Sequence, residues 1–129
     1  MLENINLLKN NDIVMKTISH LLYGTHPKTN KIKGRTVQII KFLKENGGKL
    51  EAKDLEEKLG VSRINSPSMF YKPLAALKDW DLVQSHKKVE FDESGKRKFK
   101  TTYELTPELF FHHIQKTLLE KCKTELEMV

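Results

Sequence analysis

The chain has 129 residues, of which 38% are hydrophobic and 31% charged, a composition that predicts one folded domain with helical extensions. No apolar run approaches the length of a membrane span, so no membrane partner is expected, and the first residues lack the apolar stretch of a signal peptide. The single cysteine, Cys122, excludes an internal disulfide and favours a reducing, cytoplasmic setting, while the net charge of +6 is compatible with a polyanionic partner.

Residues 1–33 are predicted to form an N-terminal helix followed by a basic linker. Residues 2–22 place apolar side chains on one helical face: Leu7, Leu8, Val14, Met15, Ile18, Leu21 and Leu22. The segment from Tyr23 to Arg35 contains the breakers Gly24, Pro27 and Gly34, so we expect a loop. This loop holds four cations and no acid, namely Lys28, Lys31, Lys33 and Arg35. It is either a solvated linker or an arm that contacts phosphates.

Residues 34–105 are predicted to form the main domain, which begins with two helices. Thr36–Asn46 has the apolar spacing of an amphipathic helix and ends at Gly47-Gly48. Lys49–Glu51 is a short extended step. Ala52–Leu59 is the second helix, and Gly60 stops it.

A third helix is predicted over Ser66–Asp79, with the Ser66 hydroxyl as its cap and Pro67 at its first position. Its buried side carries apolar side chains, and its opposite side carries small, polar and basic ones: Ser68, Tyr71, Lys72 and Ala75. Pro73 lies inside this pattern and costs about 3 kcal/mol or a kink. Either the helix is continuous and perturbed, which we favour, or the helix proper begins near Pro73.

Leu82–Leu105 is predicted to be a β-hairpin, because larger apolar groups alternate along both strands. A three-residue loop, Glu93-Ser94-Gly95, with Gly95 left-handed, pairs Val89 with Phe99 and Phe91 with Arg97. A two-residue turn at Ser94-Gly95 would mix the two faces, so we expect the longer loop. The hairpin therefore has its apolar side chains on one face.

The same register places Lys88 opposite Lys100 on the other face of the hairpin. Like charges directly across a strand pair destabilise it, so these lysines suggest contact with phosphates. Lys96, Arg97 and Lys98 extend the positive charge to the tip. The alternative is a solubilising edge, since lysines also protect exposed strands from aggregation.

Residues 106–129 are predicted to form a C-terminal helix, in which Thr106 supplies a capping hydroxyl and Pro107 the first position. Apolar side chains recur at helical spacing: Phe110, Phe111, Ile114, Leu118, Cys122 and Leu126. This segment holds three Lys against four Glu, whereas residues 35–105 hold fifteen Lys or Arg against eleven acids. The apolar stripe needs a cover, either the N-terminal helix of the same chain or a second subunit. We favour a homodimer formed by the C-terminal helix together with the N-terminal helix.

The order helix, strand, helix, turn, helix and hairpin resembles the winged helix-turn-helix domains of bacterial and archaeal transcription regulators. The resemblance rests on three segments, GKLEAKDLEEKLGVS, FYKPLAALKDWDLVQ and KRKFKTTYELT, and spans about Gly34 to Thr106. The flanking helices are similar to those of the MarR-like and PadR-like branches. It implies an α+β fold with a recognition helix at about Ser66–Asp79 and a wing at Val83–Leu105. Two departures are a longer turn before that helix and Asp81 where glycine is common.

The predicted function is binding of double-stranded DNA by a dimeric transcriptional regulator. The expected contact residues are Arg63, Asn65, Ser66, Ser68, Tyr71, Lys72, Ala75, Lys88, Lys96, Arg97, Lys98 and Lys100. Two alternatives stay open: a nonspecific DNA-coating protein, and a winged-helix module that binds protein in a transcription or replication assembly. No phosphate-binding loop, nucleophile with a partner, or metal-ligand spacing is present in the sequence, so neither an enzyme nor a cofactor or metal is expected.

Overall fold

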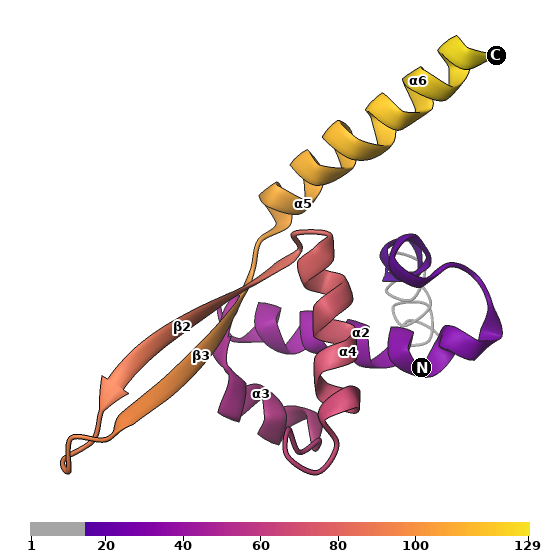
Figure 1. Ribbon diagram of the computed structural model, residues 1–129. Coiled ribbons are helices and arrows are strands. Elements are labelled where there is room, and N and C mark those ends of the chain that lie inside the picture. The colour runs from indigo at the N-terminus through magenta and orange to yellow at the C-terminus, as the bar shows by residue number, and fades with distance from the viewer. Residues whose placement is uncertain (1–14) are drawn as a thin grey trace.

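Three helices and a small antiparallel sheet form the body of the protein, from which a long hairpin and a C-terminal helix project in different directions (Figure 1). The structure, a computed structural model, describes residues 15–129. Its elements are a helix over residues 15–23, the 3-10 turn η1 (Pro27–Thr29), α2 (Asn30–Glu45), β1 (Lys49–Glu51), α3 (Ala52–Leu59), α4 (Pro67–Asp79), β2 (Val83–Phe91), β3 (Arg97–Leu105), α5 (Pro107–Ile114), the π-helical turn η2 (Gln115–Leu119) and α6 (Glu120–Met128). The predicted α+β class is confirmed. No helix in the described part is long and apolar enough to cross a membrane.

The N-terminal helix is seen over residues 15–23, and its predicted apolar positions Leu7, Leu8 and Val14 lie outside the described residues. Met15, Ile18, Leu21 and Leu22 pack against the core. The Tyr23 hydroxyl lies 2.9 Å from Oγ1 of Thr36, and the Thr36 hydroxyl donates to the carbonyl of Ile32 at 2.8 Å. Burial raises the pKa of Tyr23. This contact fixes the end of the first helix on α2.

The loop predicted from Tyr23 to Arg35 is wrong, because α2 begins at Asn30. The turn η1 precedes it: Nδ1 of His26 accepts from the backbone N–H of Lys28 at 3.1 Å, and Pro27 occupies the first position. Gly34 lies inside α2, where glycine costs about 1 kcal/mol relative to alanine. Burial of Thr36, Ile39, Ile40 and Leu43 along the same helix outweighs that cost. The short chain between the helices is therefore much less flexible than the glycines suggest.

Helix α4 is continuous through Pro73, as expected, and Gly60 ends α3 in the left-handed conformation. The ring of Pro73 is fully buried, and its packing offsets the missing backbone hydrogen bond. The predicted hydroxyl cap of Ser66 is wrong, since that side chain makes no cap hydrogen bond. The Ser62 hydroxyl instead accepts from the backbone N–H groups of Ile64 and Asn65, at 3.2 and 3.1 Å. These two hydrogen bonds stabilise the turn between α3 and α4.

The hairpin has the predicted register, in which Val89 pairs with Phe99 and Phe91 with Arg97. Gly95 has φ of 81°, as the three-residue loop requires. The carboxylate of Asp92 accepts hydrogen bonds from the Ser94 hydroxyl at 2.6 Å, the Ser94 N–H at 3.0 Å and the Lys96 N–H at 2.8 Å. These bonds lower the pKa of Asp92 and hold the tip of the hairpin.

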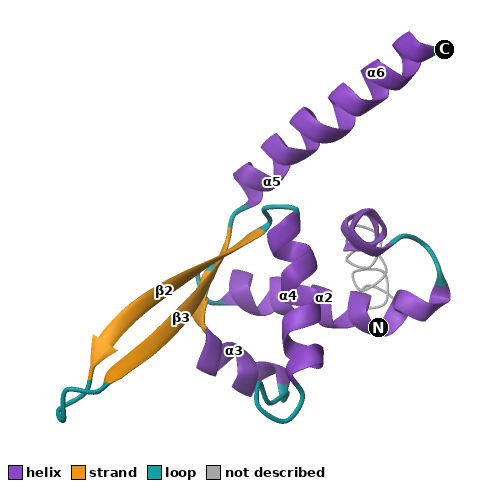
Figure 2. Ribbon diagram, in the orientation of Figure 1, coloured by secondary structure: helices purple, strands orange, loops and turns teal. Residues whose placement is uncertain are grey.

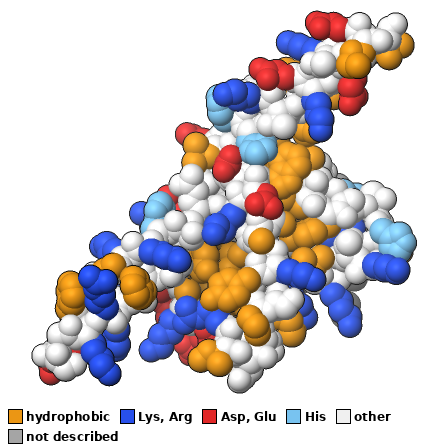
Figure 3. All heavy atoms as spheres, viewed as in Figure 1, with side chains coloured by type: hydrophobic (Ala, Val, Ile, Leu, Met, Phe, Trp, Pro, Cys, Tyr) orange, Lys and Arg blue, Asp and Glu red, His pale blue; other side chains and the backbone are white. Residues whose placement is uncertain are grey.

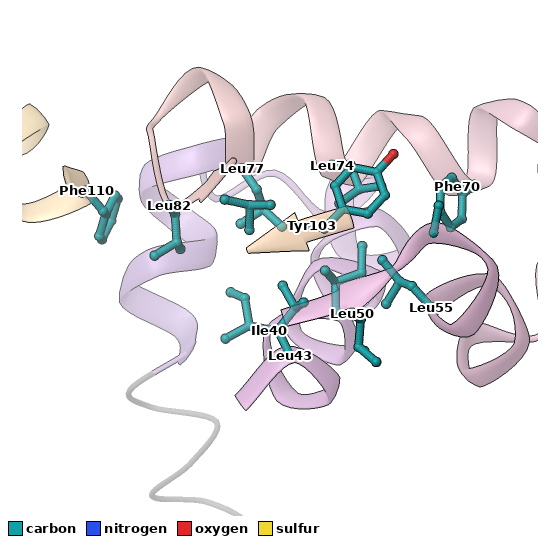
Figure 4. Close-up of a cluster of buried hydrophobic side chains, with 13 residues drawn as sticks. Ile40, Leu43, Leu50, Leu55, Phe70, Leu74, Leu77, Leu82, Tyr103 and Phe110 are labelled. Atoms are coloured by element: carbon teal, nitrogen blue, oxygen red, sulfur yellow. The ribbon is translucent and has the colours of Figure 1, made fainter. Parts of the chain in front are cut away.

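Strand β1 completes the sheet by pairing with β3, in the order β1-β3-β2, a pairing that the sequence pattern did not reveal. Leu50 of β1 lies opposite Tyr103. Both side chains point to the same side, where they join the core between the sheet and the helices (Figure 4). Burial raises the pKa of Tyr103. The core residues are Ile39, Ile40, Leu43, Leu50, Ala52, Leu55, Phe70, Leu74, Leu77, Leu82, Val83, Tyr103 and Phe110.

The C-terminal helix extends away from the body and from helix 15–23 (Figure 2). Its first turn is anchored by Phe110, which is buried in the core, and by Ile114, which packs against it. The predicted hydroxyl cap of Thr106 is wrong: this hydroxyl donates to the carbonyl of Asp81 at 2.7 Å and so joins α5 to the corner after α4. Further along, Phe111, Leu119 and Leu126 are exposed. Packing on the N-terminal helix of the same chain is not seen in the described residues.

Candidate nucleic-acid interface

Helix α4 forms a ridge with an acid-free hollow on each side. Its buried residues Phe70, Pro73, Leu74 and Leu77 fix the orientation of the helix on the core. The residues between them therefore face outward, with Tyr71 and Ala75 toward the hairpin and Ser68 and Lys72 toward the start of α2. Small side chains at Ser68 and Ala75 allow another molecule to approach the helix backbone closely.

The first hollow, which we call the hairpin groove, lies between α4 and the sheet. Its polar walls carry Arg63, Lys78, Lys87, Ser85 and Thr101, and its floor Leu74 and Tyr103. Arg63 forms an ion pair with Glu56, which raises the pKa of the arginine and holds its guanidinium against the groove. Lys78 and Lys87 form no ion pair among the described residues, and no described lining residue of this groove is an acid.

The second hollow, which we call the α2 groove, lies between α4 and the first turns of α2. Its cations are Lys28, Lys31, Arg35 and Lys72, and none has an ion-pair partner in residues 15–129. The first turn of α2 contains no acid. Cations at the positive end of a helix dipole, and like charges four residues apart as in Lys31 and Arg35, both oppose helix formation by a few tenths of a kcal/mol or more. These cations at the start of α2 destabilise the helix slightly, and a bound anion would relieve their repulsion.

The outer face of the sheet, which points away from α4, has a different character. It contains a hollow of about 540 Å³ lined by Lys49, Glu51, His86, Lys88, Glu90, Lys100, Thr102 and Glu104. Here the opposite charges are paired. Lys49 lies 3.1 Å from Glu104, which lowers the pKa of that carboxyl, and Lys100 lies 2.8 Å from Glu51 and 3.8 Å from Glu90. The bond to Glu51 raises the pKa of Lys100.

These ion pairs correct the interpretation of Lys88 and Lys100. The two lysines do lie opposite each other, as predicted. Their repulsion is compensated, however, because Glu51 arrives from β1 and Glu90 lies beside Lys100 on β2. The pairing of Lys88 with Lys100 therefore does not by itself indicate contact with phosphates.

The structure brings together only part of the predicted site. Arg63, Tyr71 and Ala75 line the hairpin groove, Ser68 and Lys72 line the α2 groove, and Asn65 and Ser66 belong to the turn before α4. Lys96 lies at the tip, Arg97 points to the same side as α4, and Lys88, Lys98 and Lys100 point to the outer face. The space-filling view shows Lys and Arg side chains along the helical body and the hairpin (Figure 3).

Sequence analysis missed two cations of the hairpin groove, Lys78 and Lys87. A signal for each was present. Tyr71, Ala75 and Lys78 follow the spacing of one helical stripe, and Lys87 shares its strand face with Val89, whose partner was predicted. Lys33, named with the basic linker, is buried beside helix 15–23 and does not reach either groove.

Comparison with protein families and with curated proteins found no match for this chain.

Proposed function

We propose that this protein binds double-stranded DNA as a winged helix-turn-helix transcriptional regulator. Helix α4 would enter the major groove, and the hairpin would serve as the wing on the phosphate backbone. The order of helix, strand, helix, helix and hairpin supports this proposal, as does the pairing of β1 with β3 beside the helices.

One observation carries the proposal: the hollow on each side of α4 is lined by several cations, and none of the described residues that line either hollow is an acid. A recognition helix in the major groove has a phosphate strand on each side. Lys28, Lys31 and Arg35 are placed to meet one strand, and Lys78 and Lys87 the other. Tyr71, Lys72 and Ala75 lie on the ridge between them, where they would face base edges.

The proposal includes a homodimer formed through the C-terminal helix. Among the described residues, Phe110, His113 and Ile114 of α5 contact the body, whereas Phe111 and Leu126 are 60% and 78% exposed. A continuous exposed apolar stripe on a projecting helix is suited to a second copy, and a two-fold dimer would place two α4 helices on two half-sites of a duplex.

The experiment compares two double variants of equal charge. Lys72→Glu with Lys87→Glu changes one cation in each groove, whereas Lys41→Glu with Lys121→Glu changes two exposed lysines that lie outside both grooves and outside the hairpin. We expect the first variant to lose at least about tenfold in duplex affinity and to reduce the slope of log K against log salt by about 2, because two phosphate contacts are removed. We expect the second to stay within a few-fold of the wild type. Equal losses in both variants would show diffuse attraction and refute the α4 surface.

Selection of bound duplexes from a random pool separates the remaining alternatives. A sequence-specific regulator enriches one motif, and a dimer enriches a motif with two-fold symmetry. Uniform recovery of all sequences would instead indicate a DNA-coating protein. Absence of binding to any duplex at low salt would leave the protein-binding module as the surviving alternative.

A further inference from the structure

The far half of the hairpin exposes apolar side chains on the side that faces α4. Phe91 is 67% exposed, Phe99 69% and Val89 51%, although these residues lie together on one face of a strand pair. Closer to the body, the same face is covered by the helices at Tyr103 and Leu50. The hairpin extends past α3 and α4, so no described helix covers its far half (Figure 1).

The charges on this face are all positive. Lys87 precedes Val89 on β2, and Arg97 lies directly opposite Phe91 on β3. The described strands place no carboxylate on this face, whereas Glu90 and Glu104 both point to the outer face. A strand face that itself presents aromatic rings and cations is complementary to a polyanion that also presents flat apolar groups. Glu51 and Glu90 of the opposite face line a hollow beside Phe99, where lysines accompany them. Nucleic-acid bases with their phosphates have this combination.

The position of the face favours DNA over an acidic peptide as the occupant. Lys87 and Thr101 line the hairpin groove and also border the exposed patch, so the patch continues the surface proposed to hold phosphates. A strand that leaves this groove along the hairpin would cross Val89 and Phe99 before it reached Phe91 and Arg97.

The spacing of the two rings indicates which form of DNA fits. Phe91 and Phe99 are diagonal neighbours across the strand pair, a relationship that separates residues by about 7–8 Å. Bases in a duplex strand stack at about 3.4 Å. Two neighbouring bases can therefore each contact one ring only if they are unstacked, as in a single strand.

We infer that this face binds unpaired bases of a single-stranded DNA segment that adjoins the duplex. One base stacks on Phe91 and its neighbour on Phe99, while Arg97 and Lys87 contact the phosphates between and beside them. The inference rests on the proposed DNA binding and specifies its ligand: a duplex with a single-stranded tail is bound more tightly than a blunt duplex.

The test measures affinity for a blunt duplex and for the same duplex with an eight-nucleotide tail on either end. We expect wild-type protein to prefer a tailed duplex. Phe91→Ala with Phe99→Ala should lose at least about 25-fold on that ligand and change little on the blunt one, because each of the two stacked bases is worth about fivefold or more. Leu109→Ala is the control, since this apolar side chain is 43% exposed on α5 and belongs neither to a groove nor to the stripe of the proposed dimer. All three substitutions are at exposed apolar side chains, and circular dichroism verifies folding.

Stacking itself is observed with a fluorescent adenine analogue in the tail. Its emission should change on binding wild-type protein and the Leu109 variant, but much less with the Phe91 and Phe99 variant. Three results would overturn the inference. The first is equal affinity of the wild-type protein for tailed and blunt duplexes, and the second is an equal loss of affinity for both duplexes in the Phe91 and Phe99 variant. The third is a variant that binds the tailed duplex as tightly as the wild type but no longer binds a peptide rich in Glu and Phe. The first two leave the proposed duplex binding intact, whereas a failure to bind any DNA refutes both proposals.

Discussion

Nδ1 of His113 lies 2.9 Å from the carboxylate of Asp81, and the imidazole packs on Trp80 with ring centroids 5.1 Å apart. Asp81 has φ of +60°, an unusual value for a residue other than glycine. Its left-handed backbone turns the chain from α4 into β2, and its side chain and carbonyl both bind the C-terminal helix. Asp81 therefore joins the corner between α4 and β2 to the C-terminal helix.

Replacement of His113 by alanine should loosen this joint. Loss of the hydrogen bond to Asp81 and of the contact with Trp80 should lower the free energy of unfolding by roughly 1–2 kcal/mol. The emission of Trp80, the single tryptophan, should shift because its ring becomes more hydrated. Urea unfolding followed by fluorescence measures both effects. The exposed neighbour His112 provides the control, and an equal loss in His112→Ala would contradict the assigned contact.

Gly34→Ala should stabilise the protein by about 0.5–1 kcal/mol in urea unfolding. Gly34 lies inside α2, and a methyl group there would meet no atom within 4 Å. Gly60→Ala is the comparison variant. A methyl group at Gly60 would also meet no atom within 4 Å, but alanine in this left-handed conformation, with φ of +66°, should lower the free energy of unfolding by about 1–2 kcal/mol. A destabilised Gly34→Ala would show that the start of α2 is not helical in solution.

The tip of the hairpin should loosen in acid. Hydrogen bonds from Ser94 and Lys96 lower the pKa of Asp92 in the folded state, so its contribution is complete above the unfolded value of about 3.9 and is lost as pH falls through the lower folded value. An NMR titration of the Asp92 carboxyl should therefore have a midpoint below 3.9. In Ser94→Ala the midpoint of the Asp92 titration should rise, because the hydrogen bond from the Ser94 hydroxyl to the Asp92 carboxylate is lost. A wild-type midpoint at or above 3.9 would contradict the observed turn.

The oligomeric state should depend on the exposed stripe of the C-terminal helix. Leu118→Glu with Leu126→Glu should convert a dimer to a monomer in sedimentation equilibrium, because charged side chains would be buried between the helices. Thr117→Glu with Thr124→Glu adds the same charge on another side of the helix and should leave the dimer intact. A wild-type protein that is monomeric at high micromolar concentration would exclude the dimer without affecting binding to DNA by one copy.

The sequence by itself determined the features that depend on nearby residues. Gly60 and Gly95 mark the end of α3 and the hairpin loop, since left-handed backbone is a property of single residues. The alternation of Val89, Phe91 and Phe99 set the register, because a shift of one residue would move every side chain to the other face. The helix through Pro73 was also foreseen.

Only the tertiary structure decided how these elements meet. The pairing of β1 with β3 places Glu51 beside Lys100, although the two residues lie far apart in the sequence, and so removes the apparent like-charge conflict. Packing against helix 15–23 extends α2 back to Asn30 and places Lys31 and Arg35 beside α4. The helices that cover one face of the sheet also decide that Lys87 faces α4 while Lys88, on the opposite face of the strand, points away from it. Such relationships depend on contacts between distant segments, and local periodicity carries no information about which segments pair.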